Sequence, residues 1–252
     1  MEILKTSSLS IGYNDKTIVS DINVTLHEGD IIALIGPNGA GKSTLFKTFS
    51  THIKPVSGTI ELFGKDLLSY TPKERAKLLG IVLTERPDDM FLKVFDVVAA
   101  GRYPYTGMFG KLSEKDEQEI KVSLELVGAN NLIDRAFNTL SDGEKQKVMI
   151  AKAIAQNTPI IMLDEPTAFL DYPSKIELFS LLKKLAKEQK KAILFSSHDL
   201  ELLLRYTDNL WIIARNEPFA AGMSSELLKN DVIKKYFKLK DIDNQYLIKN
   251  NN

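Results

Sequence analysis

The 252-residue sequence contains no cysteine. This absence excludes a disulfide framework, a thiolate metal site and a cysteine nucleophile. The 33 basic and 33 acidic residues cancel, so no net charge draws the chain to nucleic acid or acidic lipid, which argues against a nucleic-acid partner. No apolar run approaches the roughly 18 residues of a membrane span. The start, Met1–Lys5, lacks the pattern of a secretion signal, so we expect any membrane-spanning part to belong to another chain.

The chain is long enough for one large α/β domain, and its 44% hydrophobic and 26% charged residues are typical of a globular protein. Strands that alternate with helices indicate a parallel sheet covered on both faces. The first segments instead alternate like strands of a half-exposed sheet, with a turn at Asn14-Asp15. We predict strands at 9–13, 18–26, 31–35, 58–63, 81–83, 160–163, 193–196 and 210–214, and helices at 43–49, from about 71, and at 173–190.

The pattern changes from about residue 87. Segments 94–101, 113–127 and 141–156 have helical spacing, and no strand pattern lies between them. We therefore predict a helical insertion at about 87–158 within a single domain of residues 1–237. Residues 238–252 are expected to form a C-terminal tail, whose last residues, 248–252, are polar and expected to be frayed.

A glycine-rich segment follows the apolar strand Ile31–Ile35 and precedes the predicted helix Ser43–Phe49. Glycines let successive backbone N–H groups point at phosphate oxygens, and the helix start adds its positive partial charge. Lys42 would reach the β- and γ-phosphates, and the Ser43 hydroxyl would bind Mg²⁺. We also predict that Thr44 is a nucleotide-binding residue. The alternative is a plain glycine turn, but the strand and helix around it favour a nucleoside triphosphate site. The complete G-x-x-x-x-G-K-[ST] phosphate loop (P-loop) comprises Gly36, Pro37, Asn38, Gly39, Ala40, Gly41, Lys42 and Ser43.

Two carboxylates, Asp164 and Glu165, end the apolar strand Ile160–Leu163. Parallel sheets place ligand sites beyond the carboxyl ends of their strands, where the P-loop also lies. Asp164 is then positioned to hold Mg²⁺ alongside Ser43, and Glu165 to polarise the water that attacks the γ-phosphate. An ordinary acidic strand end is the alternative, and the P-loop makes it the weaker one.

The stretch 140–146, LSDGEKQ, begins a predicted helix. Ser141 is a typical N-cap, and Glu144, three residues later, completes a capping box. Alone, this pattern is typical of a well-capped surface helix. Its position shortly before the Asp-Glu strand is more specific, and the stretch resembles the LSGGQ motif of the ATP-binding cassette (ABC) family. All these motifs follow that family's order, and the resemblance covers residues 1 to about 235.

The resemblance implies an α/β P-loop NTPase with a mixed or parallel sheet, an N-terminal antiparallel β subdomain and a helical insertion. It also implies an ATP-hydrolysing homodimer, in which Ser141 and Gly143 of one copy contact the nucleotide held by the P-loop of the other. A capped helix start suits this role because its free N–H groups attract an anion. Asp142 and Glu144 stand where Gly and Gln are usual, and their added negative charge is expected to tune ATP affinity or turnover.

Further family elements can be placed on single residues. The resemblance implies that Tyr13 stacks on adenine, that His198 hydrogen-bonds the γ-phosphate, and that the loop Ala168–Asp171 contacts the opposite site. Alone, Tyr13 would suit ordinary packing and His198 a structural cap. Glu85 follows the strand at 81–83, where the family has Gln. Its carboxylate keeps an acceptor for Mg²⁺ or water but lacks the amide donor.

The segment Ala100–Tyr105, AGRYPY, is similar to the G-R-x-P element in ATPases of iron–siderophore, haem and cobalamin importers. Alone, it also suits a rigid proline-containing surface turn. We therefore expect an ATP- and Mg²⁺-dependent ATPase on the cytoplasmic face of the membrane, bound to an integral permease and served indirectly by a solute-binding protein. The alternatives are an ATPase of an exporter or lipoprotein-release system, a soluble ABC ATPase of DNA repair or translation, and a non-enzymatic interaction module.

Overall fold

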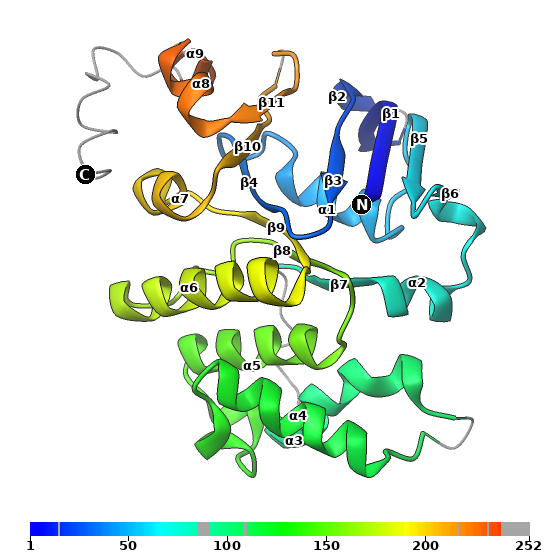
Figure 1. Cartoon of the computed structure of the whole chain (residues 1–252), viewed down its shortest axis with the longest axis vertical. Helices are drawn as coiled ribbons and strands as arrows, with labels where there is room; N and C mark the ends of the chain where they lie inside the picture. The colour runs from blue at the N-terminus through cyan, green and yellow to red at the C-terminus, as the bar shows by residue number, and fades with distance from the viewer. Residues whose placement is uncertain (15, 85–90, 108–109, 216, 231, 238–252) are drawn as a thin grey trace.

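The computed structural model describes residues 1–14, 16–84, 91–107, 110–215, 217–230 and 232–237. Within them, a six-stranded central sheet has the order β11–β10–β4–β9–β8–β7 (Figure 1). All neighbours pair in parallel except β11, which runs antiparallel to β10 at the edge. The mixed sheet implied by the resemblance is confirmed, although no sequence pattern predicted β11. The bounds are β4 Ile31–Ile35, β7 Leu79–Val82, β8 Ile160–Leu163, β9 Ala192–Ser196, β10 Asn209–Ile212 and β11 Ala220–Met223.

A second sheet of the described chain has five strands and is antiparallel around the long strand β1, which confirms the N-terminal antiparallel layer. The prediction of one strand at 18–26 is wrong, because β2 and β3 are separate and pair with opposite halves of β1. Asn23 lies between them, and its Oδ1 accepts the N–H of Ser8 at 2.7 Å. The Asn23 side chain thus takes the place of a backbone hydrogen bond at the point where the partner of β1 changes from β2 to β3. The strands are β1 Glu2–Tyr13, β2 Lys16–Ile22, β3 Thr25–His27, β5 Ser57–Leu62 and β6 Lys65–Asp66.

Successive side chains of the central strands face two different hydrophobic cores, as the pleat of a strand requires. On β4, Ala33 lies in a core with Leu182 of α6, whereas Leu34 lies in a core with Phe46 of α1. Helices therefore cover both faces of the sheet, as predicted. The two helices are α1 Lys42–Phe49 and α6 Tyr172–Gln189.

Shorter helices complete the layer around the sheets. Helix α2 begins after Thr71, whose hydroxyl forms a capping box with Glu74, and the predicted helix start there is confirmed. The sequence patterns did not predict three short helices near the C-terminus. Among the described residues, no helix combines the length and apolar character that crossing a bilayer requires. These elements are η1 Leu67–Ser69, α2 Pro72–Leu78, α7 Leu200–Tyr206, α8 Ser224–Lys229 and α9 Val232–Phe237.

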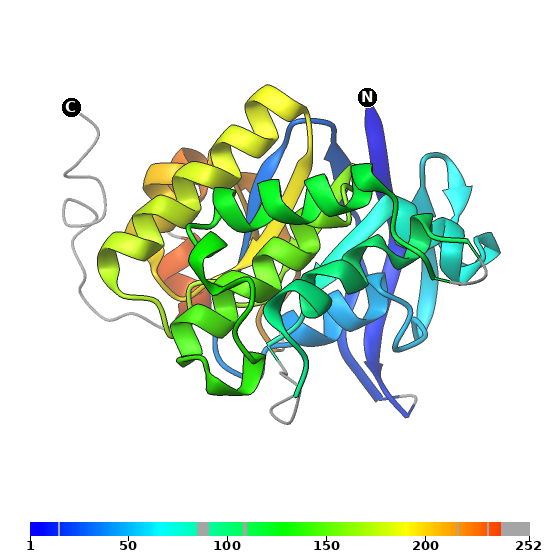
Figure 2. The same cartoon turned by 90° about the horizontal axis from the view of Figure 1, so that it is seen from below.

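The predicted helical region forms a layer at one end of the molecule, drawn in green (Figures 1 and 2). Its helices share a core of their own, which includes Val98 of α3, Leu124 of α4 and Val148 of α5. Between residues 91 and 156, no described segment forms a strand, as predicted. Helix α5 also contacts β7 and β8, so it joins this layer to the central sheet. The elements are α3 Val94–Ala99, η2 Ala100–Tyr105, α4 Glu114–Leu126, η3 Asn130–Leu132, η4 Phe137–Thr139 and α5 Asp142–Ala155.

Arg102, the arginine of the G-R-x-P element, is buried inside this layer rather than presented to a partner. Its Nε donates to Asp116 Oδ1 at 2.8 Å, its Nη1 donates to the Ala155 carbonyl at 2.7 Å, and its guanidinium lies 4.1 Å from the centre of the Tyr105 ring. Hydrogen bonds from Ser113, and secondarily the contact with Arg102, hold the pKa of Asp116 below its usual value. Arg102 thus joins η2, α4 and α5.

Replacing Arg102 by Met should destabilise the fold, because it leaves the Asp116 carboxylate buried without its cation. We expect the free energy of unfolding to fall by about 3 kcal/mol. Urea unfolding followed by circular dichroism measures this change, with Arg205→Met, at an exposed arginine of α7, as the matched control. An unfolding free energy equal to that of the control would show that the buried ion pair contributes little to the stability of the helical layer.

Candidate functional site

The P-loop joins the end of β4 to the start of α1. Gly36 passes so close to the next strand that an added Cβ would lie 2.0 Å from the carbonyl oxygen of Ile213, so no larger residue fits. Gly41 has a φ of 115°, which favours glycine, and it is the N-cap of α1 without any side-chain cap. The first N–H groups of α1 are therefore available to an anion.

Lys42 lies under the loop rather than out in solvent. Its Nζ donates to the carbonyl oxygens of Gly36 at 2.8 Å and Pro37 at 3.2 Å. Burial lowers the pKa of Lys42, and the negative charges of Glu165 and Asp164 oppose that shift. The lysine is thus held beside both predicted acidic residues, in the position from which it can turn toward a bound phosphate.

Ser43 and Thr44 point in different directions from the first turn of α1. Ser43 is exposed, whereas Thr44 is buried and its Oγ1 donates to the Tyr13 hydroxyl at 3.4 Å. Tyr13, at the end of β1, leaves 46% of its surface exposed. Arg215, which the sequence reasoning missed, donates from Nε to the Gly39 carbonyl at 3.0 Å.

Asp164 follows β8 at the same edge of the sheet. Its Oδ1 accepts the hydroxyl of Ser196 at 2.6 Å, and its Oδ2 accepts the hydroxyl of Thr84 at 3.0 Å. Ser196 also accepts the backbone N–H of Glu165 at 2.8 Å, so one hydroxyl orients both acidic residues. The sequence reasoning missed the roles of Ser196 and Thr84, because it could not tell which strands are neighbours of β8.

Glu165 and His198 meet across the ends of β8 and β9. His198 Nε2 lies 2.6 Å from Glu165 Oε1, and both side chains are partly exposed. An ionised carboxylate can only accept, so this contact places the proton on Nε2. Glu165 has a φ of 51°, in the left-handed region that few residues other than glycine adopt. The two residues that the sequence nominated separately therefore form one pair.

The predicted capping box at the start of α5 is confirmed. The Ser141 hydroxyl lies 3.3 Å from the N–H of Glu144, while the Glu144 carboxylate accepts the N–H of Ser141 at 2.8 Å and its hydroxyl at 2.9 Å. Gly143 lies close to the loop after β8, because a Cβ there would be 3.1 Å from the carbonyl oxygen of Phe169. The structure thus brings the LSDGE segment against the Ala168–Asp171 loop.

An open hollow of about 630 Å³ lies on this face. It is lined by Ser141, Gly143 and Glu144 of the LSDGE segment and by Phe169, Leu170 and Asp171 of the following loop, among others. No P-loop residue is among those that line it. The described site is therefore divided: one part surrounds the P-loop, and the other presents the capped end of α5. Glu85, predicted as a metal ligand, lies outside the described residues.

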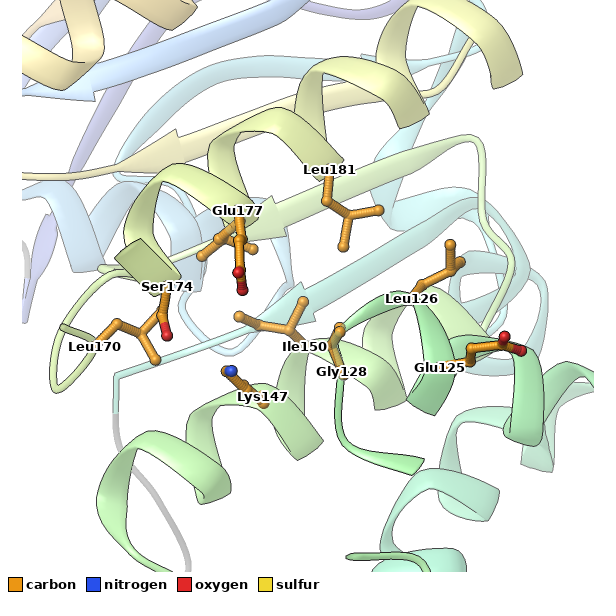
Figure 3. Close-up of a pocket in the computed structure, with 11 residues that line it drawn as sticks. Glu125, Leu126, Gly128, Lys147, Ile150, Leu170, Ser174, Glu177 and Leu181 are labelled. Carbon is orange, nitrogen blue, oxygen red and sulfur yellow. The ribbon is translucent and has the colours of Figure 1, made fainter. Parts of the chain in front are cut away.

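A cavity of about 270 Å³ adjoins this hollow and lies between α4, α5 and α6 (Figure 3). Its walls are mainly apolar, with Lys147 and Glu177 pointing into it from opposite sides, and Leu170 and Ser174 at one end. None of the residues nominated for nucleotide or metal lines this cavity. It marks the boundary between the helical layer and α6 rather than the P-loop site.

The comparisons with known proteins agree with this geometry. A family model for ABC transporters matches residues 19–168. The chain is 45% identical over 239 residues to the ABC transporter ATP-binding protein MJ0873 of Methanocaldococcus jannaschii, covering 95% of this chain and 82% of that protein. It is 36% identical over 239 residues to the iron(3+)-hydroxamate import ATP-binding protein FhuC of Bacillus subtilis, covering 95% and 89% of the two chains.

Solved structures show the same fold. A metal-chelate type ABC transporter in an inward-facing conformation superposes with a TM-score of 0.82 at 28% identity, over 95% of this chain and 90% of that one. A nucleotide-free ATP-binding cassette from an ABC transporter superposes with a TM-score of 0.81 at 25% identity, over 94% and 98%. The chain therefore belongs to the ABC transporter family, as one of its ATPase subunits.

Proposed function

We propose that this chain is the ATP-binding and ATP-hydrolysing subunit of an importer that takes up a metal chelate through a separate membrane permease. The observation that carries the proposal is the cluster of Lys42, Asp164, Glu165 and His198 at the carboxyl edge of β4, β8 and β9. These groups supply, in one place, a phosphate-binding cation, a metal-binding carboxylate, a base and a γ-phosphate sensor.

Nucleotide binding rests on the P-loop and its neighbours. The backbone N–H groups of the loop and of α1 would bind the phosphates, and Lys42 would leave its two carbonyl partners for the β- and γ-phosphates. Tyr13 would stack on the base. The Ser43 hydroxyl and the Asp164 carboxylate are hard oxygen donors of the kind that Mg²⁺ uses with phosphates, so the residues fit this ion. Bound Mg²⁺ would neutralise charge on the β- and γ-phosphate oxygens.

Hydrolysis requires a water molecule activated near the γ-phosphate. The Glu165 carboxylate is the general base in this proposal, and its neighbour Asp164 is kept for the metal by Ser196 and Thr84. His198 now donates to Glu165, and with ATP bound this Nε2–H would turn to a γ-phosphate oxygen. Release of the histidine would free Glu165 to accept the proton of the water.

A second copy of the chain would complete the site. The capped end of α5, with Ser141 and Gly143, faces a hollow with the loop Ala168–Asp171 and no P-loop residue. In the proposed homodimer, this face covers the nucleotide bound by the partner, and its N–H groups contact the γ-phosphate. Glu144 accepts both donors of Ser141, so ATP must compete with a carboxylate for that hydroxyl.

The import function and its cargo rest on the relatives. FhuC of Bacillus subtilis and FepC of Escherichia coli, at 36% and 32% identity, are named as ATP-binding proteins for iron(3+)-hydroxamate import and ferric enterobactin transport. We propose a cargo of the same class and a location on the cytoplasmic face of the membrane, with a solute-binding protein delivering the chelate. In the G-R-x-P element, Tyr103 is 60% exposed and is our candidate contact with the permease.

Replacing Lys42 by Ala should abolish tight ATP binding, because the phosphates lose their buried cation. We expect the dissociation constant of ATP to rise at least about tenfold. Titration calorimetry measures it, with Lys183→Ala, at an exposed lysine of α6, as the control. Equal affinity in the two variants would contradict the P-loop assignment.

Replacing Glu165 by Gln should trap an ATP-bound dimer, because binding is spared while the base is lost. We expect turnover to fall on the order of 10²- to 10⁴-fold. Size-exclusion chromatography with saturating ATP and Mg²⁺ should then give a dimer, whereas Glu188→Gln, at an exposed position of α6, should turn over normally. If the Glu165 variant stayed monomeric with ATP bound, the shared-site dimer would be refuted.

Replacing Tyr103 by Ala should weaken permease binding without affecting the fold, since the ring is largely exposed. We expect roughly tenfold weaker binding if the ring is an interface anchor. Binding to the detergent-solubilised permease measures this, with Met223→Ala, an exposed apolar residue of β11, as the control. Unchanged binding of the Tyr103 variant would remove the G-R-x-P element from the docking surface.

A further inference from the structure

Residues 196–199, at and just after the end of β9, are tied at each successive position to the segment that follows β8. Every tie is a contact between side chains that are more than twenty residues apart in sequence. The first three contacts involve Asp164, Thr167 and Glu165, which lie within four residues of the end of β8. The pairs are Ser196 with Asp164 at 2.6 Å, Ser197 with Thr167 at 3.4 Å, His198 with Glu165 at 2.6 Å, and Asp199 with Lys175 at 2.6 Å.

The outermost tie, between Lys175 and Asp199, differs from the other three. Lys175 lies in the first turn of α6, where its N–H donates to the Asp171 carbonyl at 3.0 Å. It therefore stands one helical turn after the Ala168–Asp171 loop. Its side chain is 24% exposed, and its Nζ reaches the Asp199 carboxylate, one residue beyond His198. None of the nucleotide contacts proposed above uses Lys175.

We propose that Lys175 is a positioning residue that makes the His198 segment and the Ala168–Asp171 loop move as one unit. The inference rests on the proposed function, in which His198 senses the γ-phosphate and the loop faces the site of the partner copy. Lys175 would then transmit loss of the γ-phosphate in one site to the loop that contacts the other site.

The contacts on the two sides of the loop favour transmission from the His198 segment to the loop. On the side of β9, Ser197 is bonded to Thr167, just before the loop, and Asp199 is bonded to Lys175, in the first turn of α6 after it. On the other side, the Phe169 carbonyl lies against Gly143, whereas Leu170 and, in α6, Ser174 line the cavity of about 270 Å³, so the space for a shift lies at the end of the loop (Figure 3).

The start of this segment is also tied to α5, because Gln146 Nε2 donates to the Pro166 carbonyl at 3.0 Å. This bond holds Pro166, which precedes the loop, and not Lys175, which follows it in α6. The end of the loop at Leu170 and Asp171 can therefore shift toward the cavity with the His198 segment while Pro166 stays with α5. Lys175 is the connection through which such a shift would pass.

The test compares Lys175→Met and Asp199→Asn with the charge-preserving Lys175→Arg, and with Lys183→Met as a matched control on an exposed face of α6. Steady-state ATP hydrolysis is measured over a range of ATP concentrations, together with nucleotide affinity. We expect Lys175→Met to bring the Hill coefficient toward 1 and to lower kcat about fivefold, with ATP affinity unchanged. Lys175→Arg should restore both values, and the double variant of Lys175→Met with Asp199→Asn should be no worse than either single one.

A second measurement does not depend on ATP. In the nucleotide-free protein, hydrogen exchange of residues 168–171 should be faster in Lys175→Met than in the wild type and in Lys183→Met. Exchange in Lys175→Met at the same rate as in Lys183→Met would show that Lys175 does not hold the loop. Faster exchange with an unchanged Hill coefficient and kcat would overturn the transmitting role and leave a structural one. A wild type that neither binds nor hydrolyses ATP would instead refute the proposed function, while the exchange result would still decide whether the tie exists.

Discussion

The parallel pairing of β4, β9 and β8 is the constraint on which the rest of the structure depends. The P-loop leaves β4, the His198 segment leaves β9 and the two acidic residues leave β8, so one sheet edge collects them all. Leu34 pairs with Ser196 in this register. Because side chains alternate along a strand, a slip of one residue would turn the Ser196 hydroxyl away from Asp164 and Glu165. Sheet register therefore determines the electrostatics of the site, including the balance of charge around buried Lys42.

Helix α5 is the element through which the helical layer and the sheet act together. Ile150 and Ile154 lie in the core that contains α6, whereas Val148 and Ala151 lie in the core of the helical layer. A helix held in two cores cannot shift without disturbing both, since protein interiors are close-packed. Its capped N-terminus presents the LSDGE segment, so packing in the layer controls where that segment lies. Arg102 has a part in this, because it bonds to the last residue of α5.

Sequence reasoning reached the parallel sheet, the helical layer, the start of α2 and the cap of α5, because each depends on local periodicity or on capping signals close together in the chain. It did not reach β3 as a separate strand, since the break at Asn23 depends on a contact with Ser8 in β1. Short helices such as α7 bury only a few side chains and have weak periodicity. Ser196 and Thr84 carry no motif of their own, and their role follows from strand order, which distant contacts determine.

What the sequence by itself determined is the chemistry: a glycine loop with lysine, a strand ending in two carboxylates, and a histidine after another strand. Those patterns are local, and the residue types limit what each group can bind or transfer. Only the tertiary structure decided which groups meet. It paired Glu165 with His198, turned Arg102 inward, and joined Lys175 to Asp199. The physical reason is that these contacts join segments far apart in the chain, and packing of the whole sheet between its helices sets their distances.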